Sequence, residues 1–145
     1  MNQYLAQQWY EQYKTGIFRF ALSILKDRTL AEDVLQETFL KLLSGRYMVH
    51  EGKEQAWLYK VARNLCYDIL RNRDREVELA EPQSREAYGY IDMISGLDLM
   101  EREIVTLKIV GGLSHKEIAR VMGLTVHASK KRYERAIQKL REEEK

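Results

Sequence analysis

The sequence contains few residues that break helices, cross-link the chain or bind metal. One proline and eight glycines occur among 145 residues, so long helices are permitted over most of its length. The single cysteine, Cys66, can form no internal disulfide and has no Cys or His partner at metal-ligand spacing. We therefore expect no metal and no cofactor. No P-loop or nucleophile elbow occurs either, so we do not expect an enzyme.

Long apolar runs are also missing. No stretch approaches the roughly 18 apolar residues that a membrane-spanning helix requires. The N-terminus, MNQYLAQQWYEQYK, lacks the basic start and the apolar stretch of a signal peptide. These absences predict a cytoplasmic protein with no direct membrane insertion.

Helical periodicity dominates what is present. Apolar residues recur at helical spacing in five stretches, the last interrupted near 111–114 and 123–125: 2–14, 16–26, 30–44, 54–73 and 98–143. No segment alternates like a strand, so we predict an all-α fold.

The segment between the last two helical stretches has a different composition. Residues 74–96 lack an apolar stripe and contain the only proline, and residues 74–98 hold seven acidic against two basic side chains. We predict two small helical domains, 1–73 and 97–145, joined by an acidic linker at 74–96. Basic residues outnumber acidic ones in the blocks on both sides, which suggests a polyanionic partner or two ordinary solvated surfaces.

The C-terminal domain carries a helix-turn-helix pattern. Ser114 and Glu117 form a capping box, Gly123 permits a left-handed turn, and Thr125 caps a second helix. Asp98 is placed to cap a supporting helix that bears Ile104, Leu107 and Ile109. The second helix has an apolar stripe made of Val126, Tyr133, Ala136, Ile137 and Leu140.

The other face of this second helix is basic. In a helix-turn-helix, the start of the second helix enters the major groove, where Arg and Lys bind guanine edges or phosphates. The alternative is a solvated amphipathic helix. We predict duplex DNA binding by five residues: His127, Lys130, Lys131, Arg132 and Arg135.

The stretch TLAEDVLQETFLKLL, residues 29–43, puts leucines on two sides of one helix. We expect Thr29 and Glu32 to form its capping box. One face is apolar and fits a core, whereas the other combines Leu40 and Leu43 with acidic and amide side chains. Either this second face docks another protein, or helix 2–14 covers it and buries Leu40; periodicity does not decide between them.

The helix at 54–73 also has two faces. Its core stripe contains Leu58, Val61, Ala62, Leu65 and Ile69. Aromatic rings among basic groups suit single-stranded nucleic acid, because bases stack on the rings and phosphates pair with the cations. The alternative is ordinary packing with polar tips in water, and we expect Trp57 to be half-buried. The opposite face contains Tyr59, Lys60, Arg63, Asn64, Tyr67 and Arg71.

Three motifs together resemble one family: DVLQETFLKL, AWLYKVARNLCYDILR and GLSHKEIARVMGLT. In this order and spacing they are similar to bacterial RNA polymerase sigma factors of the extracytoplasmic-function group, over residues 16–73 and 97–141. The resemblance implies promoter-specific transcription initiation with core RNA polymerase and promoter DNA as partners, and it is compatible with an anti-sigma factor that covers both domains.

The resemblance also implies residue roles. Docking on the polymerase clamp helices would use Asp33, Gln36, Glu37, Phe39 and Leu40. Reading of the −10 element would use Trp57, Lys60, Arg63, Asn64, Tyr67 and Arg71, with a flipped base held by the loop at 48–55. The −35 element would be read by the helix at 126–141, and the acidic linker would thread the polymerase near the RNA path.

Some positions depart from the family pattern. Ser129 stands where the family has an apolar core residue, and Glu54 stands where it has a bulky apolar one. Two other functions remain as alternatives. A stand-alone helix-turn-helix regulator that binds as a dimer would explain residues 98–141 only, and a helical adaptor would bind no DNA.

Overall fold

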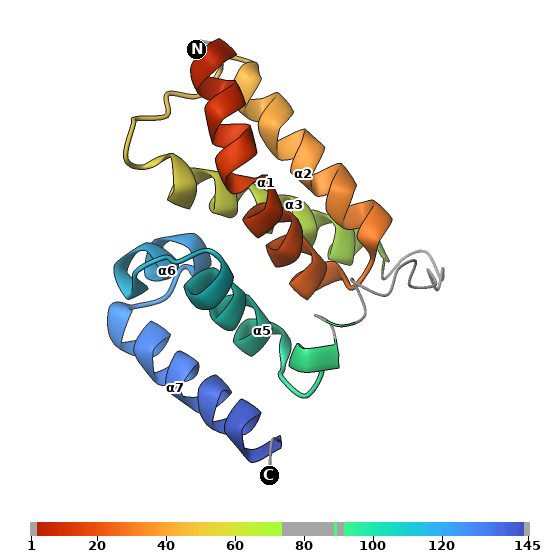
Figure 1. The fold of residues 1–145 in the computed structure, drawn as a ribbon, viewed down its shortest axis with the longest axis vertical. Helices are drawn as coiled ribbons and strands as arrows, with labels where there is room; N and C mark the ends of the chain where they lie inside the picture. The colour runs from red at the N-terminus through yellow and green to blue at the C-terminus, as the bar shows by residue number, and fades with distance from the viewer. Residues whose placement is uncertain (1–2, 74–88, 90–91, 144–145) are drawn as a thin grey trace.

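The computed structural model describes residues 3–73, 89 and 92–143, which fold into helices joined by short loops (Figure 1). This confirms the predicted all-α fold. The helices, of which η1 is π-helical, are α1 (Gln3–Leu25), α2 (Arg28–Leu43), α3 (Glu54–Arg73), α5 (Leu99–Val105), η1 (Thr106–Val110), α6 (His115–Met122) and α7 (Val126–Glu143).

The first helix is continuous, where periodicity indicated two stretches at 2–14 and 16–26. Gly16 lies within it and makes no break. A Cβ atom at this position would collide with the hydroxyl of Tyr59 on α3. The glycine therefore allows α1 and α3 to approach closely, and it does not end the helix.

Helix α2 begins one residue earlier than the predicted cap. Asp27 is the N-cap, and its carboxylate accepts a hydrogen bond from the backbone N–H of Leu30 at 3.0 Å. The predicted Thr29–Glu32 capping box is therefore wrong. Asp27 is buried and also lies 3.4 Å from the guanidinium of Arg73, so the same carboxylate holds the end of α3.

The supporting helix of the C-terminal half begins as predicted. Asp98 and Glu101 form a reciprocal capping box at the start of α5. Ile104 and Leu107 are buried, whereas Ile109 is 59% exposed.

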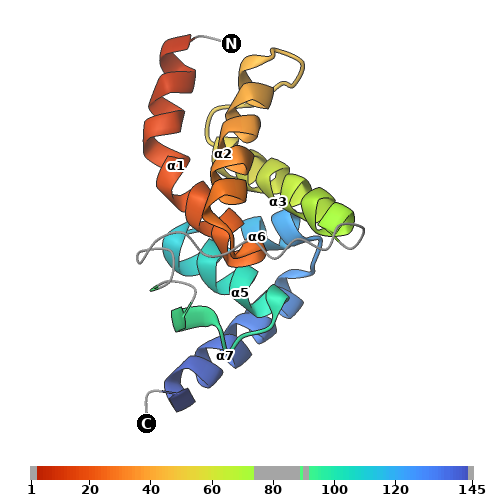
Figure 2. The same cartoon turned by 90° about the vertical axis from the view of Figure 1, so that its right-hand side faces the viewer.

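The two halves of the chain lie against each other. We call residues 3–73 the N-terminal module and residues 92–143 the C-terminal module. Helix α1 contacts α5 and η1, and α3 contacts α6. Figures 1 and 2 show α1–α3 forming one layer and α5–α7 the other. The buried residues of both layers form one continuous core.

Most of the predicted linker, residues 74–88 and 90–91, lies outside the described residues. Near the end of this segment, Ile94 is 1% exposed and belongs to the shared core together with Leu97, the first residue of the predicted C-terminal domain.

Candidate functional site

The helix-turn-helix has the geometry that its sequence predicts. Ser114 caps α6 through the backbone N–H of Glu117, and the Glu117 carboxylate accepts from the backbone N–H of Ser114. Gly123 ends α6 in the left-handed conformation, with φ of 69°. The Thr125 hydroxyl then accepts from the backbone N–H of Ala128 at 3.0 Å, which starts α7. These local contacts set the angle at which α7 leaves the turn.

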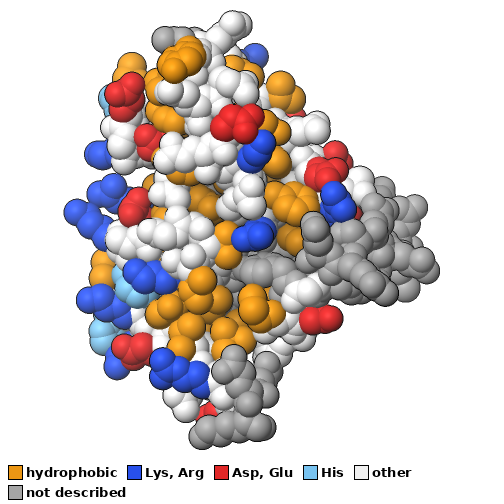
Figure 3. Space-filling model, in the orientation of Figure 1, with side chains coloured by type: hydrophobic (Ala, Val, Ile, Leu, Met, Phe, Trp, Pro, Cys, Tyr) orange, Lys and Arg blue, Asp and Glu red, His pale blue; other side chains and the backbone are white. Residues whose placement is uncertain are grey.

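The predicted duplex-reading residues lie on the outside of α7. Arg132 is half-buried, whereas the other four are exposed: His127, Lys130, Lys131 and Arg135. Figure 3 shows Lys, Arg and His side chains gathered along one edge of the molecule. This arrangement places several cations within reach of the phosphates and base edges of one DNA duplex.

The inner side of α7 contains a buried hydrogen bond. Ser129 is fully buried, and its hydroxyl lies 2.8 Å from Nδ1 of His115 on α6. The His115 ring contacts Tyr133 edge-on, with centroids 5.5 Å apart. Burial, together with Lys108 and Lys130, lowers the pKa of His115. The polar residue at this core position therefore has a partner.

The apolar stripe predicted for α7 needs one correction. Val126 is 41% exposed, although periodicity placed it inward. Ser129 and Ala136 are fully buried instead, because one helical face carries positions 129, 133, 136 and 140. The inward face of α7 therefore starts at Ser129.

Helix α3 has its predicted bounds, but the predicted division into one buried face and one solvent-exposed face does not hold. Leu58, Ala62 and Cys66 are buried along one face of the helix, and Tyr59, about 100° from Leu58, is just as buried. The assignment of Tyr59 to an open nucleic-acid face is therefore wrong. Its ring lies edge-on to Phe20 of α1, with centroids 5.4 Å apart.

The other residues predicted to contact single-stranded nucleic acid are either exposed or half-buried. Lys60, Asn64 and Arg71 are exposed, and Arg71 pairs with Asp68 on the same helix. Trp57 is half-buried, as expected, and its ring lies 5.6 Å from that of Tyr47.

Arg63 and Tyr67 face the C-terminal module. The guanidinium Nε of Arg63 donates to one carboxylate oxygen of Glu103 at 2.6 Å, and the Tyr67 hydroxyl donates to the other at 2.7 Å. The Arg63 guanidinium also lies 4.4 Å from the centroid of the Tyr67 ring. Glu103 is fully buried on α5, and burial raises its pKa against the opposing effects of Tyr67 and Arg63.

The sequence provided no signal for Glu103. An acidic residue in an amphipathic helix is usually solvated. Only the packing of α5 against α3 shows that its carboxylate joins two residues 36 and 40 positions earlier in the chain.

The predicted docking face on α2 is partly covered. Phe39 is 6% exposed and packs edge-on against Tyr10 of α1, with ring centroids 5.0 Å apart. Leu40 and Leu43 remain 59% and 52% exposed. Helix α1 therefore covers Phe39 but does not bury Leu40, so the alternative in which helix 2–14 buries Leu40 is wrong, and docking at this face stays a prediction.

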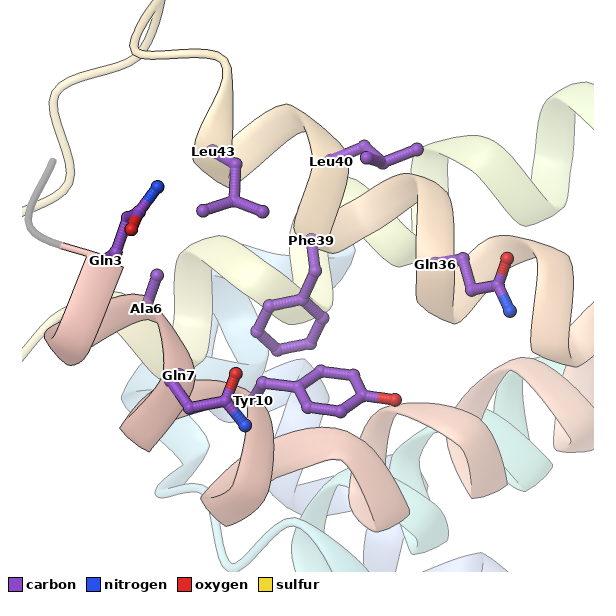
Figure 4. A pocket seen from close by; sticks show the side chains of 8 residues that line it. All are labelled: Gln3, Ala6, Gln7, Tyr10, Gln36, Phe39, Leu40 and Leu43. Carbon is purple, nitrogen blue, oxygen red and sulfur yellow. The ribbon is translucent and has the colours of Figure 1, made fainter.

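These leucines border a groove between α1 and α2 (Figure 4). The groove has a volume of about 520 Å³ and is lined by Gln3, Ala6, Gln7, Tyr10, Gln36, Phe39, Leu40 and Leu43. Asp33 and Glu37 are exposed on the same helix as Leu40. Sequence reasoning missed the contribution of α1, because periodicity within one helix does not show which helix lies beside it.

The described residues contain neither a cluster of metal ligands nor a membrane-spanning helix. No cluster of three or more His, Cys, Asp or Glu side chains in residues 3–73 and 92–143 could hold a metal ion. Among the helices described, none is both long and apolar enough to cross a membrane.

Two family models match this chain. Residues 9–76 match sigma-70 region 2, and residues 90–140 match sigma-70 region 4. The chain is 30% identical to an extracytoplasmic-function (ECF) RNA polymerase sigma factor, SigM of Bacillus subtilis, over 91% of its own length and 90% of the relative's.

Two solved structures share its fold. CnrH, solved in complex with the cytosolic domain of CnrY, matches with a TM-score of 0.77 and 26% identity, over 96% of this chain and 86% of CnrH. RpoE of Bartonella quintana, solved with the anti-sigma factor NepR, matches with a TM-score of 0.75 and 25% identity, over 94% of each chain.

Proposed function

Because this chain belongs to the extracytoplasmic-function group of RNA polymerase sigma factors, we propose that its two modules divide the work of promoter recognition. The protein directs promoter-specific transcription initiation by core RNA polymerase, and its part in this reaction is regulatory. We assign polymerase docking and −10 recognition to residues 1–73, the tether to 74–96, and −35 recognition to 97–145.

The observation that carries the docking assignment is the exposure of Leu40 and Leu43 beside a groove. A buried residue can take no part in a partner interface without unfolding, whereas these two leucines are accessible in the folded chain. Asp33, Gln36 and Glu37 are exposed along the same helix and supply a polar rim. Phe39, which is 6% exposed, supports this surface from beneath.

Recognition of the −35 element is assigned to the exposed face of α7. The order of cap, glycine turn and basic helix suits insertion into a major groove. His127, Lys130, Lys131 and Arg135 are exposed and Arg132 is half-buried on this face, where Arg and Lys side chains can pair with base edges or with phosphates.

Recognition of the −10 element is assigned to α3 and the loop before it. Lys60, Asn64 and Arg71 are exposed and ready to contact a single strand. Trp57 lies beside Tyr47 and offers an aromatic edge at the start of the helix. Arg63 and Tyr67 lie on the same helix, where both are hydrogen-bonded to Glu103.

Two further assignments follow from family membership. We infer a cytoplasmic location, because the partner is bacterial RNA polymerase. We also infer that an anti-sigma factor is a partner of this chain, since the similar sigma factor RpoE was solved in complex with the anti-sigma factor NepR.

Co-elution with core RNA polymerase tests the docking assignment. We expect Leu40→Asp to abolish binding without lowering the melting temperature, because the new carboxylate replaces an exposed side chain at the interface. Met93→Asp is the matched control, since Met93 is 56% exposed on the other module. A large fall in melting temperature for Leu40→Asp, or equal loss of binding in both variants, would contradict docking at α2.

A further inference from the structure

One buried carboxylate joins the loop before α3 to helix α1. Glu54 is the first residue of α3 and is 8% exposed. One of its carboxylate oxygens accepts a hydrogen bond from the backbone N–H of Gly52 at 2.9 Å. The other accepts from the Tyr13 hydroxyl of α1 at 3.4 Å, which is long for an O–H···O bond and therefore weaker. Glu54 thus connects three parts of the N-terminal module, and its bond to the loop is the stronger one.

The loop at 44–53 connects α2 to α3 and is held at two points (Figure 1). Near its start, the Tyr47 ring lies 5.6 Å from the ring of Trp57 in the first turn of α3. Near its end, Gly52 donates to Glu54 and has φ of 90°, a conformation that glycine adopts without strain. Met48, between these points, is 83% exposed. The exposed middle of the loop therefore lies between two fixed points, of which Glu54 provides one.

Stability alone does not explain a buried glutamate at this position. A buried charge loses its hydration, and an apolar residue of similar volume in its place is often neutral or stabilising. The family pattern has a bulky apolar residue where this chain has Glu54. The helix dipole favours a carboxylate in the first turn, but an exposed carboxylate also gains from it and avoids the cost of burial. What the buried carboxylate provides, and an apolar side chain cannot, is an acceptor for the N–H of Gly52.

We propose that Glu54 is a positioning residue for −10 recognition, whose carboxylate holds the loop at 44–53 in one arrangement beside Trp57 through the N–H of Gly52. This inference rests on the proposed function, because the loop and the start of α3 were assigned to the −10 element. Glu54 itself is too buried to contact DNA, and burial separates its charge from the phosphates. A loop with one arrangement discriminates well between bases, since its surface does not adjust to a wrong one.

Trypsin cleavage after Arg46 measures whether Glu54 fixes the loop, and it needs neither polymerase nor DNA. Arg46 is exposed in the loop and lies eight residues before Glu54, so a substitution at 54 does not alter the sequence around the cleaved bond. In the full-length protein, we expect Glu54→Leu to raise the cleavage rate by about tenfold, because loss of a charge-assisted hydrogen bond lets the loop open more often. Glu54→Gln keeps an oxygen acceptor for Gly52 and should be cleaved at close to the wild-type rate.

Glu11→Leu is the matched control, because it makes the same chemical change elsewhere in the N-terminal module. Glu11 is exposed on α1 and pairs with Lys14 of the same helix at 2.8 Å, so we expect the wild-type cleavage rate. Tyr13→Phe removes the weaker hydrogen bond to Glu54 and should raise the rate by a smaller factor than Glu54→Leu does. The melting temperature of Glu54→Leu should not fall, because an apolar side chain suits a buried site.

The second readout is base discrimination by the holoenzyme. This chain, bound to core RNA polymerase, is tested on a promoter selected from random sequences and on copies with single-base changes in the −10 or the −35 element. We expect Glu54→Leu to lower the preference for the selected −10 bases by about tenfold and to leave the preference at −35 unchanged. Co-elution with polymerase should equal that of the wild type. Glu54→Gln should retain most of the −10 preference.

Four results would overturn the proposal. These are a wild-type cleavage rate in Glu54→Leu, faster cleavage with an unchanged −10 preference, an equal loss of preference at both elements, and a fall in melting temperature in parallel with the loss of preference. Failure of the wild type to bind polymerase, or to prefer any −10 bases, would instead contradict the proposed function. The cleavage rates of the free protein report on the loop in either case.

Discussion

Helices α3 and α7 share an amphipathic sequence pattern, but their surroundings in the structure differ. Each has an apolar stripe and an opposite face with basic and polar side chains, and each was assigned to nucleic acid. Helix α7 ends the fold and packs on one side only, so four of its five predicted contact residues are exposed. Helix α3 packs against α1 and α2 of its own layer and also contacts α6 of the other, so Tyr59 is buried and Arg63 and Tyr67 are engaged.

This comparison shows that amphipathicity identifies one buried face but does not show that the other is free. A second layer of helices can cover the polar face when its side chains supply hydrogen-bond partners for the polar groups there. Glu103 does this for α3, because its two oxygens satisfy a guanidinium and a phenol. In the described residues, no buried side-chain nitrogen or oxygen lacks a hydrogen-bond partner.

The largest expected effect tests burial on α3. Tyr59→Ala removes an aromatic ring that is 1% exposed, and we expect it to lower the free energy of unfolding by about 3–5 kcal/mol, as for other buried aromatics. Lys131→Ala at the exposed face of α7 should change it by less than about 0.5 kcal/mol. Urea denaturation measures both. Similar small losses at both positions would contradict the difference between these helices.

A smaller effect tests the exposed face of α7. Arg135→Ala should weaken binding of the holoenzyme to a promoter selected from random sequences by about 1–3 kcal/mol, because a base or phosphate contact is lost. Polymerase binding should be unchanged. Arg141→Ala, at the exposed end of the same helix, serves as the control for a lost positive charge. Equal loss of promoter and polymerase binding would argue against the assigned role.

The smallest effect concerns pH and the inner side of α7. The pKa of His115 is lowered in the folded chain, so the stability due to its neutral form is present above its ordinary value of 6.5. That stability is lost as pH falls from 6.5 through the lowered pKa. Urea midpoints at pH 7.5 and 5.5 should therefore differ more for wild type than for His115→Gln. Parallel changes in the two proteins would exclude His115 as the source.

Local contacts explain which features the sequence predicted well. The Ser114 and Asp98 capping boxes, the Gly123 turn and the Thr125 cap each involve residues within four positions of one another, so residue type and spacing are enough. The bounds of α3 were predicted for the same reason. The Thr29 cap failed because Asp27, two residues earlier, offers a competing carboxylate that α3 also engages.

The groove beside Leu40 and Leu43 shows a second limit of sequence analysis, which concerns the position of the neighbouring helix. Leu40 and Leu43 could be assigned to a second face of their helix, but their exposure depended on how far α1 extends over α2. The structure shows that α1 reaches Phe39 through Tyr10 and leaves the two leucines accessible. The exposure of Leu40 and Leu43 therefore depends on how α1 packs against α2, and not on the sequence of α2 alone.

The sequence by itself determined the helices, the helix-turn-helix and the family, because these follow from spacing within about ten residues and from three motifs in order. Tertiary structure alone decided how the modules meet and which basic residues are accessible. The reason is physical: Glu103 meets Arg63 and Tyr67 across 40 and 36 positions of chain, and only the packing of one module against the other brings their side chains together.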